Sequence, residues 1–292
     1  MCKLTLLLVL VSIHAALSSY QNAKIYFYFQ NSNGVTSNVV YDLDNAVSVN
    51  SHPKYDSTKP TMLYSHGYIE SVESDTVQAI VKAYITNGRY NILAVDWRQL
   101  AAGIYPIVAA QLAILGEEVA KQILLMGVIE RLHFVGHSLG GQLGGYIGKA
   151  IISQSKGSKK LKRISALDPA GPDFYLVNLF TSRLTAADAE FVDVIHTDGG
   201  VLGYPVNTGT VDFYPNGGRR SQPGCIFLVD FLCSHQRSVY LWAESVEKGD
   251  TVSFISTSPS GSPNIQMGNN CPLSATGTYY LATAKRYPYS LS

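Results

Sequence analysis

The stretch Leu132-His-Phe-Val-Gly-His-Ser-Leu-Gly-Gly141 decides the fold of this chain. The apolar residues from Leu132 to Val135 predict a short strand, and helical spacing begins near Gly141 and continues to about residue 152. A Gly-x-Ser-x-Gly motif between a strand and a helix is typical of a nucleophile elbow, a sharp turn that exposes one serine hydroxyl. The glycines leave room where strand and helix pass closely. Ser138 then stands at a helix N-terminus, where the helix dipole favours developing negative charge.

Apolar strands and helical segments alternate on both sides of this motif. Strands are expected at 24–29, 35–41, 60–65, 91–95, 163–167, 191–195 and 211–214, with weaker candidates at 252–255 and 277–281, and further helices at 72–86, 107–126 and 235–246. The first two strands form a hairpin around the turn 31–34. This alternation predicts an α/β fold in one domain, with a mostly parallel central sheet and helices on both faces.

The first eighteen residues are typical of a secretory signal peptide. Lys3 precedes an apolar run over 4–13, and small residues at 16–18 favour cleavage after Ser18. The apolar run is shorter than the roughly 18 residues that span a bilayer. We therefore expect a signal peptide at 1–18, a secreted α/β domain at 19–292 and no transmembrane segment. The net charge of +1 at pH 7 indicates no strong attraction to nucleic acid.

The cysteines fit an oxidising compartment. Cys225 and Cys233 are the expected disulfide pair, enclosing a loop of seven residues, and Cys271 then has no evident mate. The pattern Cys233-x-His235 has no second ligand pair at zinc spacing, so we do not interpret it as a metal site. We expect no cofactor.

A serine hydroxyl becomes nucleophilic when a base takes its proton, and the base needs a third group to orient it. In α/β-hydrolases these residues follow in the order serine, acid, histidine, from loops at the carboxyl ends of strands. After Ser138 only His196 and His235 remain, and we rank His235 first because it follows the expected disulfide at the start of a helix. Asp168 ends the next strand and is the expected acid, with Asp198 as runner-up.

An oxyanion hole requires two backbone N–H donors. The residue after the nucleophile, Leu139, supplies one, and a loop after an early strand supplies the other. The segment His66-Gly67-Tyr68 stands at that place, so we assign the Tyr68 N–H as the second donor. His133 and His137 are interpreted as structural.

Eight motifs taken together resemble the animal pancreatic-lipase family over nearly the whole mature chain. They are HGY (66–68), VDW (95–97), GHSLGG (136–141), LDPAGP (167–172), DAEFVDVIHTDG (188–199), VDFYPNGG (211–218), QPGC (222–225) and CSHQRS (233–238). The resemblance implies an α/β-hydrolase fold with Ser138 as nucleophile, Asp168 as acid and His235 as base. It also implies hydrolysis of fatty-acyl esters in glycerolipids at a micelle, droplet or membrane surface.

In this family the loop between the two cysteines before the catalytic histidine is the lid. Here the lid consists of Ile226, Phe227, Leu228, Val229, Asp230, Phe231 and Leu232. Seven residues closed by a disulfide are too few to cover a cleft and reopen, so the chain resembles the phospholipase A1 branch, which includes insect enzymes. We expect the apolar lid side chains to enter a lipid surface. A neutral triacylglycerol lipase remains an alternative, as does, from another class, a lipid-binding protein of the yolk type.

Two further features depart from the family pattern. The β-sandwich domain with which larger lipases bind colipase has no counterpart in the sequence, so we expect no colipase partner. The family's calcium loop precedes Asp188, but Thr185 stands where an acidic ligand is expected. We therefore expect no required metal.

Overall fold

The computed structural model describes residues 22–175, 181–226 and 229–292. The expected signal peptide and the lid residues Phe227 and Leu228 lie outside the described residues. Nine strands form the main sheet of the described chain: β1 (Lys24–Gln30), β2 (Thr36–Asp42), β3 (Thr61–Ser65), β4 (Asn91–Asp96), β5 (Leu132–His137), β6 (Leu161–Leu167), β7 (Ala189–Ile195), β8 (Val211–Pro215) and β11 (Gly277–Leu281).

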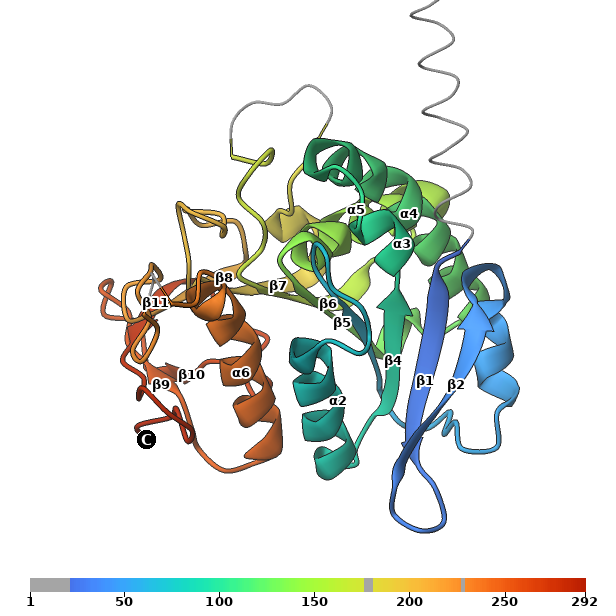
Figure 1. Ribbon diagram of the computed structural model, residues 1–292, viewed down its shortest axis with the longest axis horizontal. Helices are drawn as coiled ribbons and strands as arrows, with labels where there is room; N and C mark the ends of the chain where they lie inside the picture. Colours follow the sequence, from blue (N-terminus) through green and yellow to red (C-terminus); the bar gives the residue numbers. More distant parts are fainter. Residues whose placement is uncertain (1–21, 176–180, 227–228) are drawn as a thin grey trace, which may run out of the picture.

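The strands follow the order β11-β8-β7-β6-β5-β3-β4-β1-β2 across the sheet (Figure 1). Strand β1 pairs antiparallel with β2 and β4, and the other pairs are parallel. The central strands β3, β4 and β5 are buried along their whole length. Continuous burial is typical of parallel strands that have helices on both faces. It explains why the sequences of these strands are mostly apolar.

Helices cover both faces of the sheet (Figure 1). They are α2 (Asp75–Asn87), α3 (Arg98–Ala101), α4 (Tyr105–Met126), α5 (Leu139–Gln154) and α6 (Cys233–Glu247), with 3-10 helices η1 (Leu43–Ser51), η2 (Ile129–Arg131) and η3 (Ala186–Asp188). Glycines in the left-handed conformation end two of the helices, Gly88 after α2 and Gly127 after α4.

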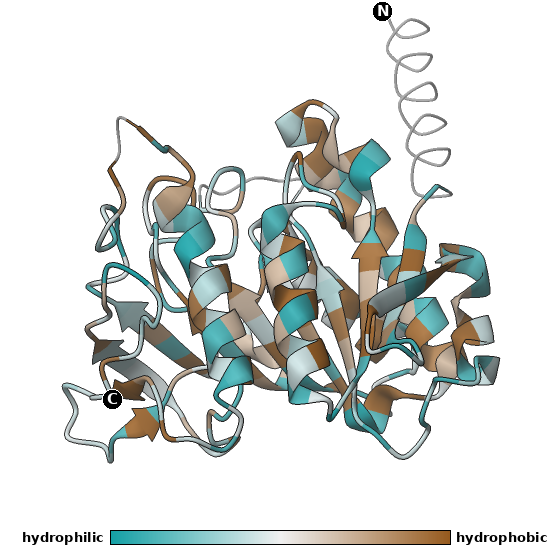
Figure 2. Ribbon diagram, turned by 60° about the horizontal axis from the view of Figure 1, so that its bottom comes forward, coloured by the Kyte–Doolittle hydropathy of each residue, from teal (hydrophilic) through white to brown (hydrophobic). Residues whose placement is uncertain are grey.

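The apolar residues form two cores, one on each side of the sheet. One core joins the sheet to α4, α5 and η1, and the other joins it to α2 and α6. Successive strand residues point to opposite faces, so Leu63 belongs to the first core and its neighbours Met62 and Tyr64 to the second. The surface helices accordingly carry both hydrophobic and hydrophilic residues (Figure 2). None of the helices in the described ranges has the length and apolarity to cross a bilayer.

The predicted fold class is confirmed, and the strands and helices lie close to their expected positions. The expected strand at 252–255 is wrong, because only the two-residue strand β9 (Ile255–Ser256) forms, paired with β10 (Ile265–Gln266). The backbone N–H groups of Phe254 and Ile255 donate to the hydroxyls of Ser290 and Ser292. These side-chain acceptors replace the neighbouring strand that a longer ladder would require.

The sheet brings the functional motifs to one edge. The last residues of β5 and β6, His137 and Leu167, are register partners, and Leu167 is in turn the partner of Ile195 at the end of β7. Ser65, which ends β3, pairs with Gly136 of β5. Loops that leave these strands therefore start side by side at the carboxyl edge, the usual position of ligand sites in parallel sheets.

Candidate active site

Ser138 has the backbone conformation of a nucleophile elbow. Its φ of 56° lies in the left-handed region, which is uncommon for a residue with a side chain. Hydrogen bonds on both sides hold this conformation: the Ser138 N–H donates to the Leu167 carbonyl at 3.1 Å, and the Ala170 N–H donates to the Ser138 carbonyl at 3.0 Å. The elbow is thereby fixed to the strand end and loop that carry Asp168.

The elbow glycines are required by close approach of the backbone. A Cβ at Gly136 would lie 2.2 Å from the Gly140 carbonyl oxygen, and a Cβ at Gly140 would lie 2.3 Å from the Ser65 carbonyl oxygen. Any side chain at either position would separate β5 from α5 or α5 from β3.

Asp168 follows β6 and is fully buried. One carboxylate oxygen accepts the N–H groups of Thr197 (2.8 Å) and Asp198 (3.0 Å), and the other lies 2.6 Å from Nδ1 of His235. Because Nδ1 faces a carboxylate, it carries the proton, and Nε2 of His235 is left as the acceptor. A Cβ at Gly203 would lie 2.4 Å from the same carboxylate, so the facing loop packs tightly on the acid.

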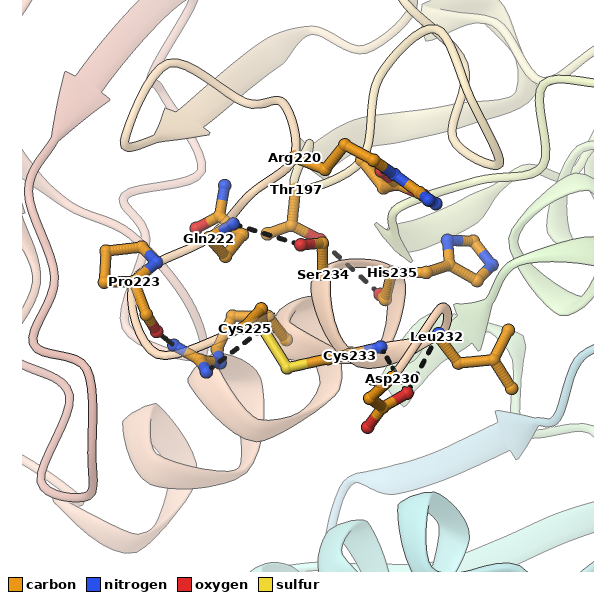
Figure 3. Close-up of a disulfide and its surroundings, with 12 residues drawn as sticks. Thr197, Arg220, Gln222, Pro223, Cys225, Asp230, Leu232, Cys233, Ser234 and His235 are labelled. Atoms are coloured by element: carbon orange, nitrogen blue, oxygen red, sulfur yellow. Dashed lines mark hydrogen bonds and ion pairs between the residues drawn. A yellow bond between two sulfur atoms is a disulfide. The ribbon is translucent and has the colours of Figure 1, made fainter. Parts of the chain in front are cut away.

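The disulfide fixes the start of α6 and with it His235 (Figure 3). The predicted Cys225–Cys233 bond is present, with a Cα–Cα distance of 5.6 Å. Asp230 of the lid accepts the N–H groups of Leu232 and Cys233, both at 3.0 Å, which satisfies donors at the beginning of the helix. Cys271 is a free, buried cysteine.

A second histidine packs against His235. The rings of His137 and His235 have centroids 4.6 Å apart, and Nδ1 of His137 lies 3.1 Å from the Glu70 carboxylate. Burial alone would lower the pKa of His137, but the charge of Glu70 and the hydrogen bond to it raise that pKa above its ordinary value. Burial likewise opposes ionisation of Glu70, whereas His137, Thr76 and a backbone N–H together hold the pKa of Glu70 below its ordinary value.

Glu70 also anchors the loop assigned to the oxyanion hole. It accepts the N–H of Gly67 at 2.7 Å and the hydroxyl of Thr76 at 2.6 Å. A Cβ at Gly67 would lie 2.8 Å from the Ser138 Cβ, so this loop lies directly against the nucleophile. Since the Gly67 N–H is bonded to Glu70, the Tyr68 N–H remains our choice for the second oxyanion donor. Glu70 stands only three residues after Gly67, but no sequence motif marks it as a residue of the site.

The runner-up residues have other partners. The ring nitrogens of His196 contact the Asp212 carboxylate at 2.8 Å and the Tyr204 carbonyl at 3.0 Å. Asp198 forms a bidentate pair with Arg220.

Another serine, histidine and aspartate meet in the middle of the sheet. The Ser165 hydroxyl lies 2.8 Å from Nε2 of His133 and donates to Asp193 at 2.6 Å. Asp193 is also paired with Arg163 at 2.8 Å. In this group the serine lies between the other two residues, and no imidazole nitrogen joins serine to carboxylate in the order that proton transfer requires.

Two places in the described residues have oxygen or nitrogen groups that a metal ion could bind. Side-chain donor atoms of Asp168, Asp198 and His235 lie within 4.8 Å of one another, but these groups bind each other and Arg220. At the calcium loop of the family, the Lys149 ammonium contacts the Asp188 carboxylate at 2.6 Å and the Arg183 carbonyl at 2.8 Å. A cation of the chain thus holds the oxygens that calcium would need, and the residues present do not fit that ion.

The parallel sheet and the elbow at its carboxyl edge define an α/β-hydrolase. The sequence comparisons are more specific: the Lipase family model matches residues 11–278. The chain therefore belongs to the Lipase family, the pancreatic-lipase family that its motifs resemble.

Individual relatives include both lipases and phospholipases by name. The chain is 37% identical to Lipase member H of Oryctolagus cuniculus, over 67% of this chain and 44% of that protein. It is 32% identical to phospholipase A1 of Vespula vulgaris, over 76% of this chain and 70% of that protein. Phospholipase A1 of Vespa crabro is 29% identical, over 86% of this chain and 91% of that protein. The chain thus spans less than half the length of Lipase member H but most of the insect phospholipases.

Proposed function

We propose that this chain is a secreted serine hydrolase that cleaves fatty-acyl esters of glycerolipids, with phospholipase A1 activity as its main reaction. Triacylglycerol or galactolipid hydrolysis is the accompanying activity that the same site would support. The observation that carries the proposal is the 2.6 Å contact between Asp168 and Nδ1 of His235, whose ring packs on that of His137, the residue before Ser138. Membership of the Lipase family also supports hydrolysis of lipid esters.

The reaction begins with proton transfer from Ser138 to Nε2 of His235, while Asp168 orients the ring and stabilises the imidazolium. The Ser138 oxygen attacks the acyl carbonyl, and the N–H groups of Leu139 and Tyr68 bind the oxyanion. His235 then protonates the departing glycerol oxygen. A water molecule, deprotonated by His235, attacks the acyl-enzyme and releases the fatty acid. No step requires a metal ion or cofactor.

An apolar pocket beside the acid suits an acyl chain. Its volume is about 290 Å³, and its walls are Gly171, Pro172, Asp173, Tyr175, Gly200, Val201, Gly203 and Pro205. Gly203 is the residue that packs on the Asp168 carboxylate. We therefore place the acyl chain of a bound ester in this pocket, one wall of which, at Gly203, packs on Asp168.

The described part of the lid exposes apolar side chains to water. Val229 is 80% exposed and Ile226 65%, and Ile69 of the oxyanion loop is 69% exposed. Phe231 and Leu232 are also among the exposed large hydrophobic residues. Apolar groups at the rim of a site on a monomeric protein mark an interaction surface, and a lipid aggregate is the partner that the proposed substrate supplies. We infer no nucleic acid or colipase partner.

Secretion is supported by the N-terminal signal pattern and by the Cys225–Cys233 disulfide, a bond that persists in oxidising surroundings. Residues 1–18 would be removed on secretion and residues 19–292 would form the mature hydrolase domain.

Two assays test the proposal. The first treats the folded protein with a fluorophosphonate ester, for which we expect one added mass at Ser138 and none in Ser138→Ala. Absence of labelling on the folded protein would support the alternative of a non-catalytic lipid-binding protein. Retention of Ser138, Asp168 and His235 argues against that alternative.

The second assay measures fatty-acid release from phosphatidylcholine and from triolein, with the cleaved position resolved. We expect release from the sn-1 position of phosphatidylcholine. The short lid supports this result, because an uncovered mouth has space for a polar head group beside the ester. Release from triolein alone would replace the proposal by its close alternative, a neutral triacylglycerol lipase.

A further inference from the structure

We propose that Arg220 is a positioning residue. It binds the Asp198 carboxylate, so that Asp168 and not Asp198 accepts the Nδ1–H of His235. The inference rests on the function proposed above, since it takes Ser138, Asp168 and His235 as the triad. It concerns a different residue, which contacts neither the nucleophile nor the base in the described hydrogen bonds.

Two buried carboxylates lie beside the imidazole. Donor atoms of Asp168, Asp198 and His235 lie within 4.8 Å of one another, and the side chains of both aspartates are fully buried. Two unscreened carboxylates at such separations repel each other, and each would attract the protonated ring. The chemistry requires one of them to orient the ring and the other to be neutralised.

Arg220 provides that neutralisation. Its Nε donates to one oxygen of Asp198 at 2.5 Å, and a second guanidinium nitrogen donates to the other oxygen. The Leu202 N–H also donates to Asp198, at 3.3 Å. Bidentate pairing with arginine fixes a carboxylate in both distance and plane. Asp198 is thereby held away from His235, while its backbone N–H remains bonded to Asp168.

Phe231 of the lid packs on this ion pair. The Arg220 guanidinium carbon lies 4.3 Å from the centroid of the Phe231 ring, and the arginine side chain is only 12% exposed. Figure 3 shows the end of Arg220 on the side of the site where the His235 imidazole lies. An aromatic face over a guanidinium stabilises the cation and limits its contact with water. Phe231 therefore strengthens the pair from the lid.

The Arg220 guanidinium offsets the charge of Asp198, so Asp168 is the uncompensated carboxylate beside His235. The groups that face its ring are Asp168 from the end of β6, Asp198 from the turn after β7, and His137 from β5, which is itself paired with Glu70. Removing the guanidinium would leave one uncompensated anion beside the imidazole. The protonated ring would be favoured, and Asp198 would compete with Asp168 for the Nδ1 proton.

The test is the pH dependence of kcat/KM on a water-soluble ester, p-nitrophenyl butyrate, which avoids effects on lipid binding. Arg220→Gln should move the acid limb to higher pH by about one unit or more, because the uncompensated negative charge of Asp198 favours the protonated imidazole. Asp198→Asn combined with Arg220→Gln should restore the wild-type midpoint. Arg220→Lys, which keeps the charge but not the bidentate geometry, should shift it less. The neighbouring exposed arginine gives a matched control, Arg219→Gln, with no shift.

The lid contribution is measured in the same way. Phe231→Leu should shift the acid limb in the same direction by a smaller amount, and the control Arg219→Gln should not. Fluorophosphonate titration counts the competent molecules in each preparation, so that partial unfolding does not enter the rates. An unshifted profile in Arg220→Gln, or failure of the double variant to restore the midpoint, overturns the inference. Failure of the wild type to label at Ser138 overturns the proposed function instead.

Discussion

Two groups of a serine, a histidine and an aspartate occupy the same sheet and differ in the order of their contacts. At the carboxyl edge, His235 contacts the Asp168 carboxylate through Nδ1 and keeps Nε2 for a proton from outside. In the middle of the sheet, the Ser165 hydroxyl lies between His133 and Asp193 and bonds to both. We therefore propose that backbone position and the order of contacts, and not proximity of the three residue types alone, make Ser138 the nucleophile.

The inner group has a different task. Arg163 bonds to Asp193 and to the carbonyl groups of Gly268 and Asn269, and it lies 5.4 Å from the centroid of Trp242. These contacts tie the C-terminal segment and α6 to the strands. Burial, and then the charge of Arg163, hold the pKa of His133 well below its usual range. The inner histidine is therefore neutral and structural.

The largest effect is expected when each of the two serines is replaced by alanine in a separate variant. Ser138→Ala should reduce kcat by about 10⁶-fold, as removal of a triad nucleophile does, with an unchanged melting temperature. Ser165→Ala should keep kcat and lose about 1–3 kcal/mol of unfolding free energy, since His133 and Asp193 both lose a buried partner. Single-turnover kinetics and thermal unfolding measure the two quantities. Equal losses of kcat in both variants would contradict the distinction.

The two aspartates form the next pair. Asp168→Asn should lower kcat by about 10⁴-fold, because the amide no longer holds His235 in the required tautomer. Asp193→Asn should instead destabilise the protein by about 3–5 kcal/mol, because it leaves the buried Arg163 without its counter-ion. Rates are expressed per fluorophosphonate-titrated site, and stability is taken from urea unfolding. A catalytic defect per intact site in Asp193→Asn would refute a purely structural inner group.

A third prediction concerns the lid, which lies beside the outer group of residues and not beside the inner one. Replacing Phe227 and Phe231 by serine should weaken binding to phosphatidylcholine vesicles by roughly tenfold or more, given about 1.5–3 kcal/mol for each buried phenylalanine. Co-sedimentation gives the partition coefficient, and Ser138→Ala with an intact lid is the control. Unchanged partitioning would indicate that the lid side chains pack on the protein.

The short, disulfide-closed lid also predicts little interfacial activation. The hydrolysis rate should rise smoothly as a short-chain phospholipid passes its critical micelle concentration, because no cover has to move. A steep increase at that concentration would show that the site is closed in solution.

The fold class, the elbow turn with its flanking strand and helix, and the Cys225–Cys233 disulfide could be predicted because each depends on local sequence rules. Gly136 and Gly140 stand where side chains would clash, and His235 follows a disulfide that closes a short loop. The charge pairs could not be predicted in this way. Glu70 meets His137 across 67 residues, and Asp198 meets Arg220 across 22, because loops from different strands converge at one edge.

The two buried histidines beside these groups should respond to pH in opposite directions. His133 has a lowered pKa, so the stability it contributes is present above pH 6.5 and is lost as the pH falls below that value. His137 has a raised pKa, so its contribution is present below pH 6.5 and is lost as the pH rises through the raised value. Each slope is limited to about 1.4 kcal/mol per pH unit.

Urea unfolding between pH 4.5 and 9 measures this dependence. His133→Gln should flatten the acidic side of the stability curve, and His137→Gln the alkaline side. If both slopes of stability against pH persist in the two variants, the slopes arise from groups other than His133 and His137.

The smallest expected effect is that of chelation. Lys149 places an ammonium group between the Asp188 carboxylate and the Arg183 carbonyl, so the loop before β7 is already closed by a cation of the chain. Activity and melting temperature should therefore be the same in EDTA and in calcium. Lys149→Met should lower stability by about 1–3 kcal/mol, because the buried Asp188 loses a partner. Loss of activity in EDTA, restored by calcium, would show that an ion holds this loop in place of the lysine.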